Sequence, residues 1–249
     1  MKKLLVLAST LVLAATVSQL VCAATAEEDV AHYVEALKGA RPVRVKAIDE
    51  LAWKGISDQR VFDPIEQLVL ADLNSGSSGG DRNAIEQELR GLSYSGQSKY
   101  LPTLQKAEAD MRYSRYAKIA LGELPGYARW NPIISDRSTW DPRNSDDDNR
   151  LLNMLHSNDL VLKRIAGKRV YFEKKDQVVL DAMAADIKAN FHNKHSGDEA
   201  DGLAWMIKGL GSAQQVQYRP LFVQVAEESP DHEAVSHAKR VLDKYLPNP

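Results

Sequence analysis

Residues 34–51 read VEALKGARPVRVKAIDEL, and this stretch decides the fold. Apolar residues recur at helical spacing on both sides of a short break that begins at Gly39 and ends at Pro42. Glycine commonly follows the last residue of a helix, and proline is tolerated in the first turn of the next one. The stretch therefore predicts two consecutive helices joined by a tight turn.

The same pattern extends through most of the chain. No segment alternates apolar and polar residues between turn signals, as a half-buried strand would, so we predict an all-α fold without a sheet. We expect about twelve helices, near residues 30–37, 43–51, 61–73, 85–92, 101–107, 116–124, 148–157, 159–172, 174–191, 198–211, 216–228 and 231–246.

The chain also matches itself when it is shifted by 118 residues. Identical pairs at this offset include Leu37 with Leu155, Asp58-Gln59 with Asp176-Gln177, Gly91-Leu92 with Gly209-Leu210, and Tyr100 and Pro102 with Tyr218 and Pro220. One offset held over most of each segment indicates an internal duplication. We predict two related halves, 27–124 and 150–249, joined by a linker at 125–149 that has no helical period.

The helix pairs resemble HEAT repeats. In that family one helix ends in a short turn and the next opens with a Val-Arg pair followed by Ala and Leu, as Val43-Arg44, Ala47 and Leu51 do here. Similar patterns occur at 101–121, 152–166 and 222–242. The pairs run nearer thirty residues than the usual 40–47, which is similar to the short HEAT-like repeats of bacterial proteins, including phycobilisome lyases. The resemblance implies an α-solenoid of antiparallel helix pairs.

The first residues have the composition of a secretory signal peptide. Lys2 and Lys3 precede an apolar run over 4–17, and small residues follow at 23–26. We expect cleavage within 23–26 and a periplasmic or secreted protein without a transmembrane segment. A lipoprotein acylated at Cys22 is disfavoured, because Gln19, Leu20 and Val21 do not form the motif that precedes such a cysteine. Cleavage would remove the only Cys, and with it disulfides, thiolate metal sites and Cys nucleophiles.

Charge and motifs favour binding over catalysis. The chain carries 32 Lys and Arg against 34 Asp and Glu, a formal charge of −2, and nucleic acid requires a basic face. No nucleophile elbow, phosphate loop, zincin helix or dinucleotide-binding turn is present. We therefore predict a non-enzymatic scaffold that binds a protein or peptide and needs no cofactor.

The predicted linker contains the best candidates for partner binding. Trp130, Trp140, Arg129 and Arg137 lie there, and Trp and Arg are the residues that binding hot spots prefer. The preferred alternative is that Trp130 and Ile133-Ile134 pack over the junction of the halves. The other large aromatic residues at matched repeat positions are expected in the core or in turns: Trp53, Tyr94, Tyr100, Trp205 and Tyr218.

Two further clusters suggest chemistry less strongly. His192 and His195, with Asp198 and Glu199, form the one group of metal-like composition, and they are the basis of the alternative hypothesis of an enzyme or a metal-binding protein. The corresponding loop of the first half has no His, so drift in a solvated loop is the preferred reading. The acids at 146–148 lack the spacing of a calcium loop and are expected to open a helix.

Overall fold

The computed structural model describes residues 25–75, 82–173 and 176–246, and over this part of the chain the regular structure is entirely helical. The α-helices are α1 (Ala26–Leu37), α2 (Arg41–Leu51), α3 (Gln59–Ser75), α4 (Arg82–Tyr94), α5 (Leu101–Ala109), α6 (Ser114–Ile134), α7 (Asp146–His156), α8 (Leu160–Phe172), α9 (Gln177–Asn190), α10 (Asp198–Ser212), α11 (Arg219–Glu228) and α12 (His232–Lys244). Short 3₁₀ helices lie at η1 (Ser98–Tyr100), η2 (Arg137–Thr139) and η3 (Val216–Tyr218). The all-α prediction is confirmed for these residues.

Local signals place the helix ends where the sequence indicates them. α2 has Pro42 in its first turn and ends at Leu51. α7 begins with three acidic residues, and the Ser145 hydroxyl accepts a hydrogen bond from the Asp148 amide at 3.1 Å. Acids in the first turn stabilise the positive end of the helix dipole, so the expectation for residues 146–148 is confirmed.

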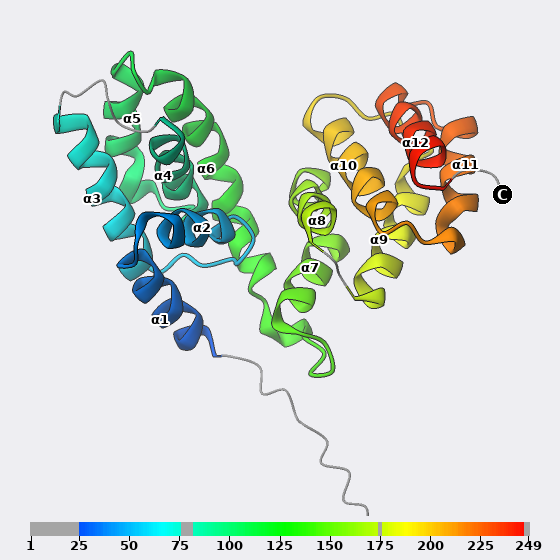
Figure 1. Cartoon of the computed structure of the whole chain (residues 1–249), viewed down its shortest axis with the longest axis horizontal. Helices are drawn as coiled ribbons and strands as arrows, with labels where there is room; N and C mark the ends of the chain where they lie inside the picture. The colour runs from blue at the N-terminus through cyan, green and yellow to red at the C-terminus, as the bar shows by residue number, and fades with distance from the viewer. Residues whose placement is uncertain (1–24, 76–81, 174–175, 247–249) are drawn as a thin grey trace, which may run out of the picture.

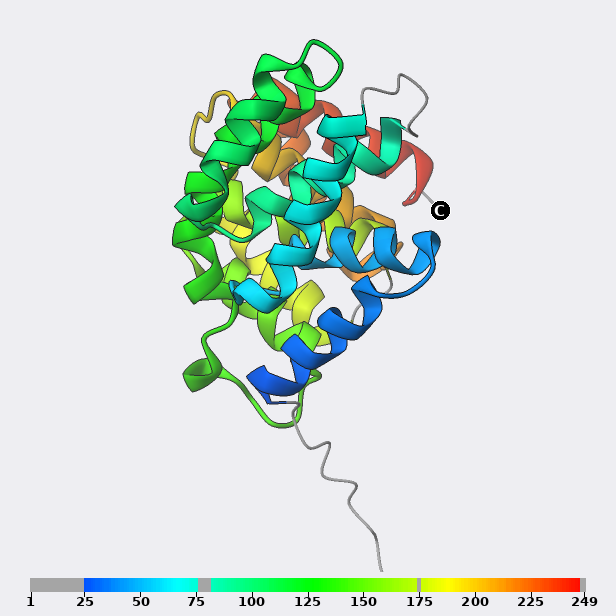
Figure 2. The same ribbon diagram turned by 90° about the vertical axis from the view of Figure 1, so that its left-hand side faces the viewer.

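Each helix makes its main contacts with the next helix along the chain or with the one after that. Figure 1 shows α1–α6 and α7–α12 as two groups that meet where α6 runs into α7 and separate toward the opposite end. Figure 2 shows the groups overlapping when the molecule is turned by 90°. Along the chain, α2, α4 and α6 contact one another in sequence, as do α8, α10 and α12.

The two halves repeat the same elements at the predicted offset. η1 and η3 begin at residues 98 and 216, and α5 and α11 follow at 101 and 219. A partly buried hydrogen bond recurs with them: the Tyr100 hydroxyl donates to Asp63 at 2.8 Å, and the Tyr218 hydroxyl donates to Asp181 at 2.5 Å. Both tyrosines thus tie a 3₁₀ turn to the helix two elements earlier.

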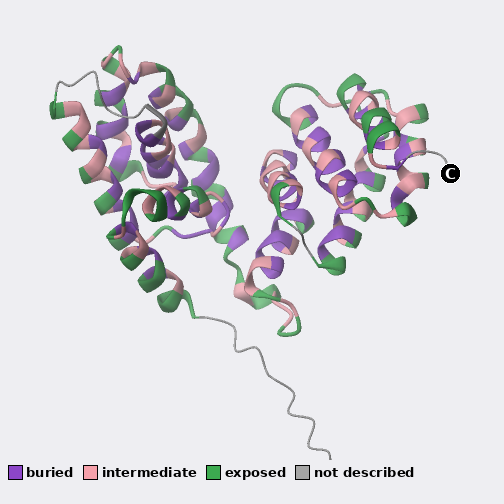
Figure 3. Cartoon of the chain, viewed as in Figure 1, coloured by how far each residue is buried: buried purple, intermediate pink, exposed green. Residues whose placement is uncertain are grey.

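The apolar stripes of these helices meet in one connected core. Figure 3 shows buried residues on the helices of both groups, and the apolar cluster runs from Val30 to Leu246. Val61 and Val179, which correspond at the 118-residue offset, are both fully buried. Tyr94, Tyr100 and Tyr218 are buried as expected.

The prediction of a non-helical linker from residue 125 was wrong for residues 125–134. α6 continues through Pro125 and Pro132 to Ile134, although each proline removes one backbone donor. Packing compensates: Asn131 donates to the Tyr94 carbonyl at 2.8 Å and to the Ser57 hydroxyl at 2.9 Å. Tertiary contacts therefore hold helical a segment whose local sequence disfavours it.

No helix among the described residues is long and apolar enough to cross a membrane. The predicted signal peptide, including Lys2, Lys3 and Cys22, lies outside these residues except for its last two positions. Of those, Thr25 caps α1, where its hydroxyl accepts from the Glu28 amide at 3.2 Å, and Ala26 is the first residue of the helix.

Candidate binding cleft

A cleft of about 370 Å³ separates the two groups of helices and is lined by residues of both. The first wall consists of residues from α2, α4 and α6 and the turn after α2; the second consists of residues from α8 and α10. Its lining is Asp49, Ala52, Trp53, Arg90, Tyr94, Glu123, Tyr127, Trp130, Arg164, Ile165, Lys168, Arg169, Phe172 and Trp205. We call it the inter-half cleft.

Packed aromatic rings form the first wall. The ring centroids of Tyr94 and Tyr127 are 4.9 Å apart, and those of Tyr127 and Trp130 are 5.2 Å apart in an edge-to-face arrangement. Trp130 is 6% exposed, and its indole N–H donates to Asp159 at 2.6 Å. A Cβ atom on Gly126 would lie 2.5 Å from the Trp130 ring, so only glycine leaves room for it there. The rings of this wall are therefore closely packed against one another.

The second wall is more exposed and more basic. Phe172 is 70% exposed, and its ring centroid lies 6.4 Å from that of Trp205, which is half-buried. The Trp205 ring carries two lysine ammonium groups, with Lys208 Nζ 3.3 Å and Lys168 Nζ 5.1 Å from its centroid. Burial lowers the pKa of Lys168, and the charge of Arg164 lowers it further. Burial also lowers the pKa of Lys208.

The arginines of the cleft are engaged within the protein. Arg90 binds Glu123 at 3.3 Å on the first wall. On the second wall, Arg164 binds Asp198 at 3.1 Å and Asp201 at 3.2 Å. Arg169 is ion-paired with Glu173 and places its guanidinium 4.1 Å from the Trp53 ring centroid, which connects the two walls.

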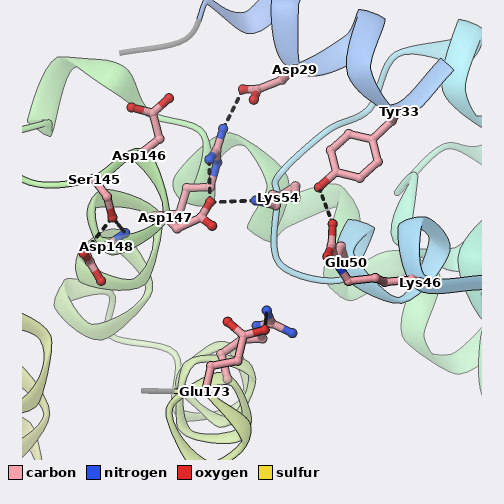
Figure 4. A network of polar contacts seen from close by, with 12 residues as sticks. Asp29, Tyr33, Lys46, Glu50, Lys54, Ser145, Asp146, Asp147, Asp148 and Glu173 are labelled. Carbon is pink, nitrogen blue, oxygen red and sulfur yellow. Dashed lines mark hydrogen bonds and ion pairs between the residues drawn. The ribbon is translucent and has the colours of Figure 1, made fainter. Parts of the chain in front are cut away.

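A polar network ties the halves together beside the cleft (Figure 4). Arg150, on α7, is buried and donates to Asp29 of α1 at 2.5 Å and to Asp147 at 3.0 Å. Lys54, after α2, also binds Asp147, at 2.6 Å. Each acid thus receives a cation from the other half or from the junction, so the network fixes how the walls face each other.

Of the four predicted binding residues, Trp130 alone lines the cleft. Arg129 is exposed on α6 and donates to the Pro125 carbonyl of its own helix at 2.9 Å. Arg137 binds Asp29 at 2.8 Å and stacks 4.3 Å from the Trp140 ring centroid. Trp140 is half-buried between Arg137 and Arg150 and belongs to the network at the junction.

The two histidines singled out from the sequence lie away from the cleft. His195 Nε2 is 3.1 Å from the Asn190 carbonyl, and Nδ1 is 3.9 Å from Glu199. His192 is exposed, 4.0 Å from Glu228. Asp198 is bound to Arg164. In the described ranges, no three His, Cys, Asp or Glu residues come together as metal ligands.

Sequence reasoning missed the second wall. Trp205 was expected in the core or a turn, yet it is only half-buried and lies beside Lys168 and Lys208. A signal was present: residues 160–172, LVLKRIAGKRVYF, contain four basic and no acidic residues. The local sequence does not show which helix face turns toward the other half, so these residues were not singled out.

Comparison with known proteins gives little. No family model matches the sequence, and no curated protein matches it. Among solved structures, human deoxyhypusine hydroxylase in complex with glycerol is similar over 88% of this chain and 96% of that one, at 11% identity and a TM-score of 0.38. This similarity is too low to assign a family or an activity.

Proposed function

We propose that the protein is a non-enzymatic binding module that holds a peptide segment of a partner protein in the inter-half cleft. The supporting observation is the cleft itself, where aromatic side chains from both halves converge on one concave surface. Binding sites are typically concave, mostly apolar and preformed, with a few polar groups that fix orientation. Aromatic residues give large contact area at low entropic cost.

The architecture proposed with this function is a short HEAT-like solenoid. The recurrence of the Val-Arg…Ala…Leu pattern and the contacts of each helix with its nearest neighbours support it. Solenoids commonly bind extended segments along a concave face. The N-terminal pattern of Lys2, Lys3 and an apolar run supports export to the periplasm or beyond.

The position of Phe172 suggests how a partner is held. This side chain is 70% exposed at the cleft, where it lies beside Trp205 and has apolar area left to bury. A partner side chain inserted between Phe172 and the aromatic first wall would be desolvated on both sides. Burial of apolar area contributes about 25 cal/mol per Å², so Phe172 is the expected anchor.

The test is selection of peptides from a displayed random library on the full-length mature protein. Selected peptides should bind the Phe172→Ser variant at least tenfold more weakly. Val216→Ser is the matched control, because Val216 is 73% exposed and does not line the cleft; binding to it should be unchanged. A library that yields no binders, or binders insensitive to Phe172→Ser, would contradict the proposal.

A further inference from the structure

We infer that the second wall of the inter-half cleft selects acidic protein segments, with a carboxylate of the partner bound by Lys168, which lines the cleft, and by Lys208, which is outside the lining but lies over the same Trp205 ring. The inference rests on the proposed binding function and names the class of partner. It depends on three observations: the positive charge of α8, which of the cations near the cleft already have an acidic partner, and the difference in charge between the two walls.

The charge of the second wall is not neutralised from within its main helix. α8 carries Lys163, Arg164, Lys168 and Arg169 and no acidic residue. Lys163 is buried and ion-paired with Asp186, and both arginines have acidic partners. Lys168 is therefore the cation of this helix that is left for an external anion.

Lys168 and Lys208 both lack an ion-pair partner among the described residues. In the described part of the chain, no carboxylate lies within the 4.0 Å ion-pair distance of either ammonium group. The charge of Asp201 acts on both ammonium groups, but Asp201 binds Arg164 at 3.2 Å. Their partial burial depresses both pKa values, and an added carboxylate would offset that cost.

The first wall orients the bound segment. It places Glu123, which is paired with Arg90, and exposed Asp49 across the cleft from the lysines. An acidic side chain is repelled there and attracted to the second wall. The aromatic rings between the two sets of charges suit an apolar or aromatic neighbour of that acid. The cleft therefore fits an acidic residue next to a hydrophobic one.

A protein segment suits this cleft better than a nucleic acid does. Nucleic acid binding needs a run of cations that follows successive phosphates, whereas here two lysines converge on one indole and acids stand opposite. The whole chain has a formal charge of −2. The volume of about 370 Å³ accommodates a few side chains.

The first readout is the composition of the selected peptides, which should be enriched in Asp and Glu beside an aromatic or aliphatic residue. The most enriched peptide, labelled with a fluorophore, is then titrated in parallel with a version in which Asn and Gln replace every Asp and Glu. Fluorescence anisotropy should give a Kd at least tenfold lower for the acidic peptide, and added salt should reduce the difference.

Variants assign the effect to the lysines. Lys168→Gln with Lys208→Gln should abolish the preference for the acidic peptide, whereas Lys168→Arg with Lys208→Arg, which keeps the charge, should retain most of it. The control pair is Lys118→Gln with Lys188→Gln, two exposed lysines that do not line the cleft. Circular dichroism checks that every variant folds.

Two results would overturn the inference while the proposed function stands. One is cleft-binding peptides with equal Kd values in their acidic and amide forms, or a preference unaffected by the Gln pair. The other is displacement of the peptide by a single-stranded oligonucleotide or anionic vesicles at lower concentration than by unlabelled acidic peptide. A library without binders would overturn both proposals.

Discussion

The two walls of the inter-half cleft use corresponding helices of the two halves, α2 and α4 in the first and α8 and α10 in the second, but different positions on those helices, and they differ in charge. At the 118-residue offset, Trp53 corresponds to Tyr171 and Arg90 to Lys208, so an aromatic and a basic side chain recur. Other positions diverge: Glu50 corresponds to Lys168, and Gln87 to Trp205.

The contrast separates the residues that hold the fold in both halves from the residues of the proposed binding surface. The hydrogen bond of Tyr100 with Asp63 is repeated by Tyr218 with Asp181, because both halves need it to hold a turn. The cleft residues have no such shared task. The second wall therefore contains residues that differ from their counterparts in the first half: Lys168 replaces an acid, and Trp205 replaces a polar side chain.

The largest effect is expected at Arg150, which joins the halves. Asp29 and Asp147 correspond at the same offset, and Arg150 binds both while only 3% of its side chain is exposed. Arg150→Met should lower the free energy of unfolding by about 4 kcal/mol, because it removes two charge-assisted hydrogen bonds from a buried site. Asp29 keeps its ion pair with Arg137, and Asp147 keeps its ion pair with Lys54. Urea denaturation measures this.

The control for that variant is Arg143→Met, since Arg143 also binds an acid but its side chain is 86% exposed. Its stability should match the parent protein. A loss below about 1 kcal/mol for Arg150→Met would show that the junction does not depend on this network.

Trp130→Ala should come next, with a loss of about 3 kcal/mol from lost burial and the cavity left between the Tyr127 ring and Asp159. Trp140→Ala should cost less, because that ring is half-buried. Thermal and urea unfolding of the two single variants would rank them. If both variants lost little free energy of unfolding, Trp130 would not be a packed core residue, and the prediction that it binds a partner would regain support.

Glu88 is a buried acid that should make the first half less stable than the second at the matched position. Glu88 is 4% exposed, and its counterpart at the offset is the fully buried Met206. Burial, reinforced by the charge of Asp72, raises the pKa of Glu88 from 4.5 to about 7. The folded protein therefore retains this proton after the unfolded chain has lost it, and stability should fall as pH rises from about 4.5 to about 7.

Glu88→Met should remove that fall and raise the free energy of unfolding by about 2 kcal/mol near pH 8. It should change little near pH 4.5, where the unfolded carboxyl is half-protonated. Glu35→Met, at an exposed position, serves as the control. A pH profile parallel to that of the parent would refute the assignment.

The smallest effect concerns the repeated tyrosine bond. Tyr100→Phe and Tyr218→Phe should each cost about 1 kcal/mol, because each removes one hydroxyl that donates to an aspartate. The two losses should be similar, as expected of equivalent scaffold positions. If the two losses differed by more than about 1 kcal/mol, Tyr100 and Tyr218 would not be equivalent structural positions.

Local patterns predicted most of the fold. Gly39 and Pro42 mark the turn between α1 and α2, and the identities at offset 118 anticipated the matching turns at η1 and η3. The extension of α6 through Pro125 and Pro132 escaped prediction, because its cause is a distant partner: Asn131 bonds to the carbonyl of Tyr94.

The cleft could be predicted only in part. Trp130 was singled out because binding hot spots prefer Trp and Arg, and in the structure it is a buried residue that lines the cleft. Trp205 and Lys208 were not, because the helical period shows that they share a face but not that this face turns toward the other half. Which surfaces face each other depends on long-range contacts such as that of Arg150 with Asp29.

The most direct test is a crystal structure of the mature protein bound to its most enriched peptide. Our account predicts peptide density in the inter-half cleft, with a carboxylate within about 4 Å of the Lys168 or Lys208 ammonium group and an apolar side chain against Phe172. A peptide bound on α1, α3 or α9, with the cleft empty, would contradict it.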